Sequence, residues 1–354
     1  MLLSIVSYKI ILAIAVFAVS LGVAAYATYG ERKVAGFFQD RLGPDRAGPF
    51  GLLQPIADGV KMIMKEEFIP AAANKWLFIL GPCIAMFVAN MSGVVIPWAR
   101  PMTLADGTVF QFQVSDINIG ILYVFGIVSI GVYGIMIGGW ASNNKYSLLG
   151  TLRASSQMIS YELAMGLSLV ALIMTTGTLS VGEIVTQQDK GLCNFVYQPF
   201  GFLIFIICAF AETNRAPFDL PESESELVGG YHTEFSSMKL GFYLFAEYIN
   251  MFISSAVMAS LYFGGYHFPF ENELIPSLGE NTVRILGFAI LMAKIIGFIF
   301  LFMWIRWTIP RFRYDQLMNL GWKSLLPLAI LNLVVTGLVV AVKEGWFNAP
   351  PSFY

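Results

Sequence analysis

The chain has 354 residues, of which 57% are hydrophobic and only 12% are charged. Its 21 Lys and Arg against 23 Asp and Glu leave the net charge near neutral, which excludes the basic surface that nucleic-acid binding requires. Repeated apolar runs near the roughly 20 residues that a helix needs to cross a bilayer predict an all-α polytopic membrane protein, with residues 1–354 forming one transmembrane bundle.

The apolar runs predict eight transmembrane helices, of which the fifth is the shortest. In chain order they cover residues 7–29, 76–98, 117–139, 158–176, 199–211, 238–262, 283–307 and 325–342. Most lysines and arginines lie in the loops that follow the odd-numbered helices, so the positive-inside rule places those loops on the inner side. Both termini are therefore expected on the outer, periplasmic side, and the inner loops include 30–75, 212–237 and 308–324.

The first inner loop contains an amphipathic segment. One face of a helix there would carry the apolar side chains Leu52, Ile56, Val60, Ile63 and Met64, with polar side chains on the other face. The pattern predicts a helix that lies along the membrane surface, and a simple interfacial anchor is a sufficient explanation for its apolar face.

The third predicted helix carries Gly134 and Gly138 in a G-x-x-x-G pattern. Small residues at this spacing let two helix backbones approach closely, so we expect the pattern to mark a helix–helix contact.

Residues that often bind metals do not form a motif. The three cysteines, Cys83, Cys193 and Cys208, lack C-x-x-C spacing, and the two histidines, His232 and His267, lie far apart. Any redox chemistry must therefore use a cofactor that is held elsewhere.

Three charged residues, Glu162, Glu247 and Lys294, fall inside predicted helices. An ionised side chain there costs about 2.5–3.5 kcal/mol on insertion scales, so each needs a partner, water or a proton. The two carboxylates should lie at similar depth, and Glu212 marks the inner end of the fifth helix. We interpret these acids as a proton path, because burial and like charge let carboxyl groups exchange protons near neutral pH. A buried ion pair between Glu247 and Lys294 is the structural alternative.

The segment 212–234 carries six carboxylates against one arginine, Arg215. It follows an apolar helix and contains Pro217 and Pro221, so we expect a defined conformation next to the membrane and not a solubilising tail.

Several long motifs then match one family. They are Glu31-Arg32-Lys33, residues 39–61, Ser160-Tyr161-Glu162, residues 212–226 and residues 310–315. Together they resemble the quinone-site membrane subunit of proton-pumping NADH:quinone oxidoreductase, respiratory complex I, over about residues 5–343.

The resemblance implies a subunit of a proton-translocating enzyme, with no complete catalytic site on this chain alone. Quinone would be the substrate, while FMN and the iron–sulfur clusters would lie in partner subunits, so this chain would hold no metal or prosthetic group. The expected partners are peripheral-arm iron–sulfur and quinone-site subunits, small membrane subunits, antiporter-like subunits and the lipid bilayer. The location would be the bacterial inner membrane, or the mitochondrial inner membrane for an organellar protein.

Position by position, the resemblance implies two groups of site residues. The quinone chamber or its mouth would contain Arg32, Arg41, Asp58, Phe218, Glu222 and Glu224. The acidic path into the membrane would contain Glu162, Glu212, Asp219, Glu226 and Glu247, to which we add the intramembrane Lys294.

Three positions, Asp45, Ser223 and His232, depart from the family pattern without removing a key carboxylate. Ser223 changes the conformational freedom of the acidic loop, and His232 adds a group that titrates near neutral pH. Two other functions remain open: the homologous subunit of a membrane-bound hydrogenase, and a stand-alone proton or sodium transporter. The complete first-loop motif argues against the hydrogenase subunit, and the lack of an internal repeat argues against the transporter.

Overall fold

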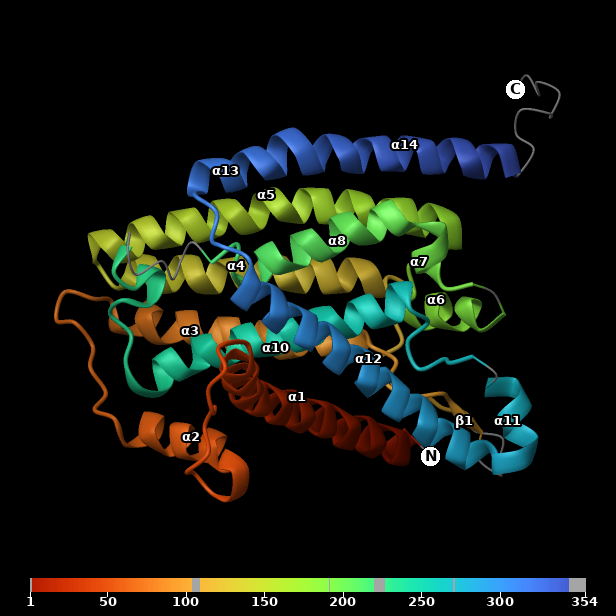
Figure 1. The fold of residues 1–354 in the computed structure, drawn as a ribbon, viewed down its shortest axis with the longest axis horizontal. Coiled ribbons are helices and arrows are strands. Elements are labelled where there is room, and N and C mark those ends of the chain that lie inside the picture. Colours follow the sequence, from red (N-terminus) through yellow and green to blue (C-terminus); the bar gives the residue numbers. More distant parts are fainter. Residues whose placement is uncertain (1, 104–108, 191, 220–226, 270, 344–354) are drawn as a thin grey trace.

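The computed structural model describes residues 2–103, 109–190, 192–219, 227–269 and 271–343. Most of the long helices run side by side, one long helix crosses them, and the short elements gather at the two ends of the bundle (Figure 1). We call the end that carries loops 30–75 and 308–324 the inner end, and the opposite end the outer end. The first long helix begins and the last one ends at the outer end (Figure 1).

Seven helical segments in the described part of the chain are long and apolar enough to cross a membrane. They are α1 (Leu2–Phe38), α3 (Lys75–Met91) with η2 (Ser92–Val95), α4 (Gly120–Ala141), α5 (Lys145–Thr176), α10 (Ser237–Tyr262), α12 (Glu280–Thr308), and the continuous run of α13 (Tyr314–Asn319), the π-helical η5 (Leu320–Leu325) and α14 (Leu326–Lys343).

The fifth predicted span is a helix, α8 (Pro199–Glu212), but it has only 14 residues. At about 1.5 Å per residue it covers about 21 Å, which is less than the hydrocarbon core of a bilayer. All eight predicted segments are therefore helical, which confirms the all-α polytopic fold, whereas seven of them meet the length of a full span.

Short elements connect these helices. At the inner end are η1 (Pro49–Gly51), α2 (Gln54–Met64) and η4 (Gly230–His232), and at the outer end are α6 (Val181–Gln187), η3 (Gln188–Lys190), α7 (Asn194–Tyr197) and α11 (Glu271–Leu278). Two short strands, β1 (Met102–Thr103) and β2 (Val109–Phe110), pair antiparallel, with Met102 opposite Phe110.

The glycine pattern in α4 produces a close helix contact, as predicted. A Cβ atom on Gly138 would lie 1.9 Å from the Tyr243 hydroxyl oxygen, and one on Gly134 would lie 2.9 Å from the backbone nitrogen of Ala85. Only glycine therefore lets α3, α4 and α10 pack at this distance.

The helix α5 begins at Lys145, well before the predicted start at residue 158. Its first turns are polar, so a hydropathy pattern does not include them. They are stabilised by packing against η4, where Ser147 Oγ donates to the backbone oxygen of Tyr231 at 2.8 Å. The side chain of Asn144 caps the start of the helix by accepting from the backbone nitrogen of Tyr146 at 2.8 Å.

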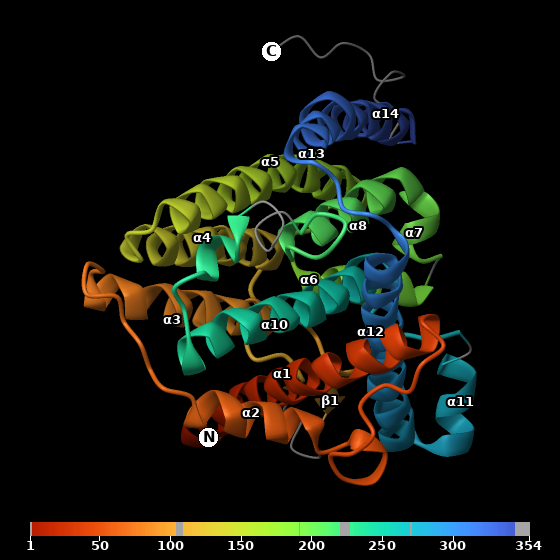
Figure 2. The ribbon, with the colours of Figure 1, turned by 60° about the vertical axis from the view of Figure 1, so that its left-hand side comes forward.

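The amphipathic helix α2 lies beside the inner end of α1, as Figures 1 and 2 show. None of its residues is buried, so its attachment to the bundle depends on polar contacts. Ser237 Oγ, at the start of α10, donates to the backbone oxygen of Met62 at 3.0 Å. In the connector from α2 to α3, the carboxyl group of Glu67 lies beside Lys239 of α10. The hydrogen bond and the positive charge of Lys239 lower the pKa of the Glu67 carboxyl. The amphipathic segment is therefore helical, as predicted, and is tied to the bundle, while its position along the membrane surface stays a prediction.

Candidate functional site

A cavity of about 290 Å³ lies at the inner ends of α1, α2, α10 and α12. Three predicted residues, Arg32, Arg41 and Asp58, line it. Arg32 Nη1 lies 2.7 Å from Asp58 Oδ2, and Gln54 donates to Asp58 Oδ1 at 3.1 Å. The fold therefore brings these parts of the 30–75 loop to one cavity.

The same cavity wall contains a charge cluster that the sequence did not predict. Glu31, which is 6% exposed, accepts from the Tyr248 hydroxyl at 2.7 Å and from Arg215 Nη1 at 3.2 Å. Arg306 pairs with the other oxygen of the Glu31 carboxylate. The Arg215 guanidinium also lies over the Tyr248 ring, 4.0 Å from its centroid. One carboxylate is thus shared by two guanidinium groups, so this part of the wall keeps an excess of positive charge.

Phe218 is placed differently from the three predicted residues above. It is buried and does not line this cavity. Its ring packs between Tyr161 and Phe312, with centroid distances of 5.4 and 5.5 Å.

The turn after α8 is held by Gln157 on α5. Its Nε2 atom donates to the backbone oxygens of Ala211 and Phe218, each at 2.8 Å. Next in the turn, Asp219 is 1% exposed, and its Oδ2 atom lies 3.1 Å from Arg311 Nη2. The predicted acid Asp219 is therefore a buried member of an ion pair with the 308–324 loop.

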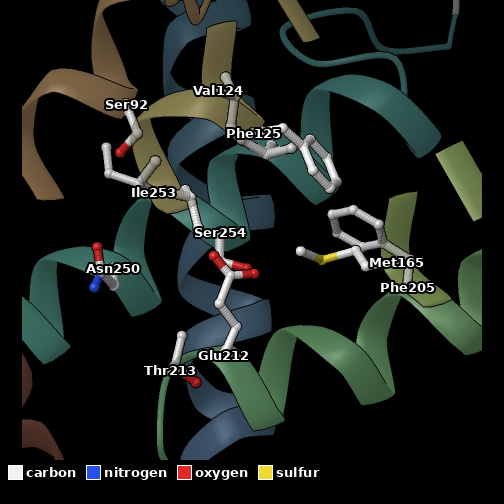
Figure 3. Close-up of a pocket in the computed structure, with 12 residues that line it drawn as sticks. Ser92, Val124, Phe125, Met165, Phe205, Glu212, Thr213, Asn250, Ile253 and Ser254 are labelled. Carbon is white, nitrogen blue, oxygen red and sulfur yellow. The ribbon is translucent and has the colours of Figure 1, made fainter. Parts of the chain in front are cut away.

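Glu212 lies between two small cavities of about 40 and 30 Å³ and lines both of them. Figure 3 shows the first cavity, with the Glu212 carboxylate pointing into it toward Ser254 and with Asn250 nearby. Glu247 lines the second cavity together with Glu212. A water needs about 10–15 Å³, so each cavity has room for ordered water between polar groups.

Glu162 and Glu247 each accept a hydrogen bond from a hydroxyl group. Ser129 donates to Glu162, and Tyr231 donates to Glu247 Oε1 at 2.8 Å. Glu162 is also close enough to Glu212 for the two carboxyl groups to interact electrostatically. The three predicted intramembrane acids therefore form one cluster.

Lys294 lies elsewhere, midway along α12 and beside the segment that follows the end of α10. Its Nζ atom donates to the backbone oxygens of Phe263, Gly265 and His267, each at 2.7 Å. Glu247 bonds Tyr231 near the inner end, so the ion pair with Lys294 that the sequence left open is not formed among the described residues. The lysine is satisfied instead by carbonyl groups that become available where α10 ends.

A second charge cluster at the outer end brings Asp189, His267 and Glu271 within 4.8 Å of one another. Both oxygens of Glu271 have protein partners, because Arg100 Nη1 lies 2.8 Å from Oε1 and His267 Nδ1 lies 2.8 Å from Oε2. Burial disfavours the ionised carboxylate, but the hydrogen bond and charge of His267 and the charge of Arg100 outweigh it and lower the pKa of Glu271. We interpret the three residues as an ion-pair cluster and not as a metal site.

Some predicted positions lie outside the described residues: Glu222, Ser223, Glu224 and Glu226. Their roles stay predictions. His232 belongs to η4, where its ring packs against Tyr231 at a centroid distance of 5.0 Å.

Comparisons with known proteins agree along most of the chain. The family model described as NADH dehydrogenase matches residues 10–337. An H subunit of NADH-quinone oxidoreductase from Cytophaga hutchinsonii is 66% identical over 332 residues, or 94% of this chain and 96% of that protein. The H subunit of the same enzyme from Flavobacterium psychrophilum is 62% identical over 93% of this chain and 96% of its own length. A protein of Rhodothermus marinus named NADH-quinone oxidoreductase subunit 8 is 50% identical over 90% of this chain and 93% of its own length. The matched region includes both the inner-end cavity and the acid cluster.

Proposed function

Because this chain belongs to the family of NADH-quinone oxidoreductase H subunits, we propose that its inner-end cavity receives the quinone headgroup and that its acid cluster carries the coupled protons. The chain is a membrane subunit of that enzyme complex, and the complex supplies what a single subunit lacks. The family assignment also removes the two other functions that the sequence left open, a hydrogenase subunit and a stand-alone transporter.

We further propose the arrangement of the subunit in its membrane. The short α8 completes a set of eight spans, both termini lie on the outer side, and the membrane is the bacterial inner membrane. Peripheral-arm subunits with the iron–sulfur clusters and FMN would meet the inner end. Small membrane subunits and antiporter-like subunits would pack along the bundle.

The charges of the inner-end cavity support its role toward quinone. A quinone headgroup presents carbonyl oxygens, which accept hydrogen bonds best from charged donors. Arg32 and Arg41 line the cavity, and the Glu31 cluster adds Arg306 and, behind it, Arg215. The exposed apolar face of α2 lies beside this cavity and suits the approach of a hydrophobic tail from the bilayer. Glu222 and Glu224 remain proposed members of this chamber, and Phe218 would support it from the core.

The position of Glu212 is the observation that supports the proposed proton path. Glu212 lines both small cavities, so it connects the cavity of Glu247 with the one beside Met165 and Phe205 (Figure 3). Reduction of quinone to quinol consumes two electrons and two protons. Charge that appears and disappears at the headgroup therefore changes the protonation of nearby acids, and carboxyl groups linked by water pass that change inward. Asp219 and Glu226 would connect the chamber to this cluster.

The first experiment replaces Glu212 by Gln, which keeps the shape but removes the proton exchange. We expect Glu212→Gln to lower proton translocation by the assembled complex at least about tenfold, because an essential proton carrier is lost. The rate is measured in inverted vesicles. Glu66→Gln is the control, because Glu66 is an exposed acid in the inner connector. Translocation at the native rate in Glu212→Gln would remove the proposed path, and the same substitution at Glu162 and Glu247 extends the test.

The second experiment tests the cavity for quinone. Asp58→Asn leaves Arg32 without its charged partner at 2.7 Å, so we expect the KM for a short-chain quinone to rise several-fold, while the complex still assembles. Lys61→Gln is the matched control one turn along α2, since Lys61 Nζ lies 3.9 Å from Asp58 and is largely exposed. Equal KM values for Asp58→Asn and the native complex would place the headgroup elsewhere.

A further inference from the structure

A large cavity lies at the outer end of the bundle, away from both parts of the proposed site. Its volume is about 680 Å³, and its walls come from the ends of α5 and α14 and from the junction of α7 with α8. Figure 1 shows these ends at the side of the molecule that also carries α6.

The cavity reaches deep into the region that the bilayer occupies. Along α14, Asn332 and Lys343 both line it, and at 1.5 Å per residue they are separated by about 16 Å. Because the hydrocarbon core is about 30 Å thick, Asn332 lies near its middle if Lys343 lies at the outer surface.

The backbone is broken at this depth. Gln198 separates α7 from α8 with φ −132° and ψ 57°, outside the helical range. Non-helical backbone occurs at membrane depth only where it is buried in protein or lines a water-filled cavity, and Gln198 lines this cavity.

The cavity wall is polar at its deep end. Gln198 Nε2 donates to Thr336 Oγ1 at 2.9 Å, and Asn332 Nδ2 donates to Gln198 Oε1 at 3.3 Å. Ten of the eighteen lining residues carry a polar side chain. Polar side chains facing lipid would lose hydrogen bonds to water, so this composition favours an aqueous interior.

A second outer-end cavity provides the contrast. It has a volume of about 340 Å³, lies between α1 and α12, and is lined by apolar side chains apart from Arg284. The guanidinium of Arg284 is already bonded to Glu280 and Asn281, both at 2.6 Å. A lipid chain suits that cavity, whereas it does not suit the polar one beside α14.

We propose that the cavity between α5, α7, α8 and α14 is a water-filled vestibule that opens to the outer compartment and ends at Gln198, Asn332 and Thr336. Further along α8, Ile204 and Phe205 are buried, and Phe205 lines the Glu212 cavity but not the vestibule. The vestibule and the Glu212 cavity share no lining residue. The vestibule does not depend on whether Glu212 carries protons.

Cysteine labelling along one helix tests the vestibule. Val335 and Val339 line the cavity, while Val334 and Leu338 are as exposed on the isolated chain but do not line it. Each is changed to Cys in a background with Cys83→Ser and Cys193→Ser, and NADH oxidation by the assembled complex confirms that each variant folds. A membrane-impermeant, charged thiol reagent is then applied to right-side-out membranes and, separately, to inverted vesicles.

We expect the cysteines at 335 and 339 to react from the outer side roughly tenfold or more faster than those at 334 and 338, because only a hydrated thiol ionises to the reactive thiolate. Similar slow rates at all four positions would mean that lipid or a neighbouring subunit fills the cavity, and would overturn the vestibule. Faster reaction from the inner side would overturn its outward opening. Neither result changes the test of Glu212.

Discussion

Two tyrosine hydroxyls that face one cavity have different partners. Tyr231 and Tyr243 both line the cavity shared by Glu212 and Glu247. The Tyr231 hydroxyl donates to the Glu247 carboxylate at 2.8 Å, whereas that of Tyr243 donates to the backbone oxygen of Gly134 at 3.0 Å. A hydrogen bond to a charged group contributes about 1.5–3 kcal/mol, more than one to a neutral group. Tyr231 is therefore a positioning residue for Glu247 if that acid exchanges protons.

The pair of substitutions Tyr231→Phe and Tyr243→Phe separates this role from packing. We expect Tyr231→Phe to lower proton translocation several-fold and to change its pH profile, because Glu247 loses a donor. Tyr243→Phe should keep the native pH profile, since its lost partner is a carbonyl group. Unchanged pH profiles in both variants, measured in inverted vesicles, would show that Tyr231 serves only the packing of η4.

At the level of single residues, the sequence could predict which residues share a site when they belong to one motif. Arg32, Arg41 and Asp58 belong to one inner loop, so a family resemblance places them together. The cluster of Glu31 with Arg215 and Arg306 joins three separate segments, and Glu31 and Arg215 are 184 residues apart. No spacing links them, so only the packed fold reveals the cluster. The sequence offered two separate signals, the position of Glu31 within the first motif and the lone Arg215 among the acids of 212–234, but nothing that joined them.

Helices could be predicted wherever apolar residues alone cross the bilayer. The polar first turns of α5 were missed, because their stability comes from contacts with η4 that hydropathy does not register. The lone charge of Lys294 suggested a carboxylate partner, yet three carbonyl groups beyond the end of α10 hold it. In both cases the missing information was a contact with a segment that is distant in the sequence.

The close contact of α4 with α3 and α10 predicts that a larger side chain at this contact impairs assembly. Gly138→Ala would place a methyl group 1.9 Å from the Tyr243 hydroxyl oxygen, so α4 or α10 must shift. Overpacking of this kind costs about 1–3 kcal/mol, and we expect less assembled complex on native gels and a lower melting temperature. Gly126→Ala in the same helix is the control, since no atom lies within 4 Å of the added Cβ. Equal assembly of the two variants would show that α4 does not need a glycine at 138.

The whole molecule has charged clusters at both ends and a mainly apolar middle. The inner clusters serve the proposed site, whereas the outer cluster of Asp189, His267 and Glu271 ties together elements that are far apart in sequence. Arg100 joins it from the segment before β1, and Lys294 bonds the backbone oxygen of His267 from α12. The outer end is therefore fixed by charge contacts, which depend on pH.

Glu271 determines whether the stability of the outer end rises or falls with pH. Its pKa is lowered below the ordinary value of about 4.3, so the ionised form stabilises the folded outer end above that value. The stabilisation is lost as pH falls through the lowered pKa. We expect Glu271→Gln to increase hydrogen exchange of the amides at 263–269 about tenfold at pH 7, equivalent to about 1.4 kcal/mol. The native complex should approach the variant only below about pH 4.

Glu273→Gln is the matched control, because Glu273 is exposed on the same helix. A native-like exchange rate in Glu271→Gln at pH 7 would mean that the Lys294 contacts alone hold this end.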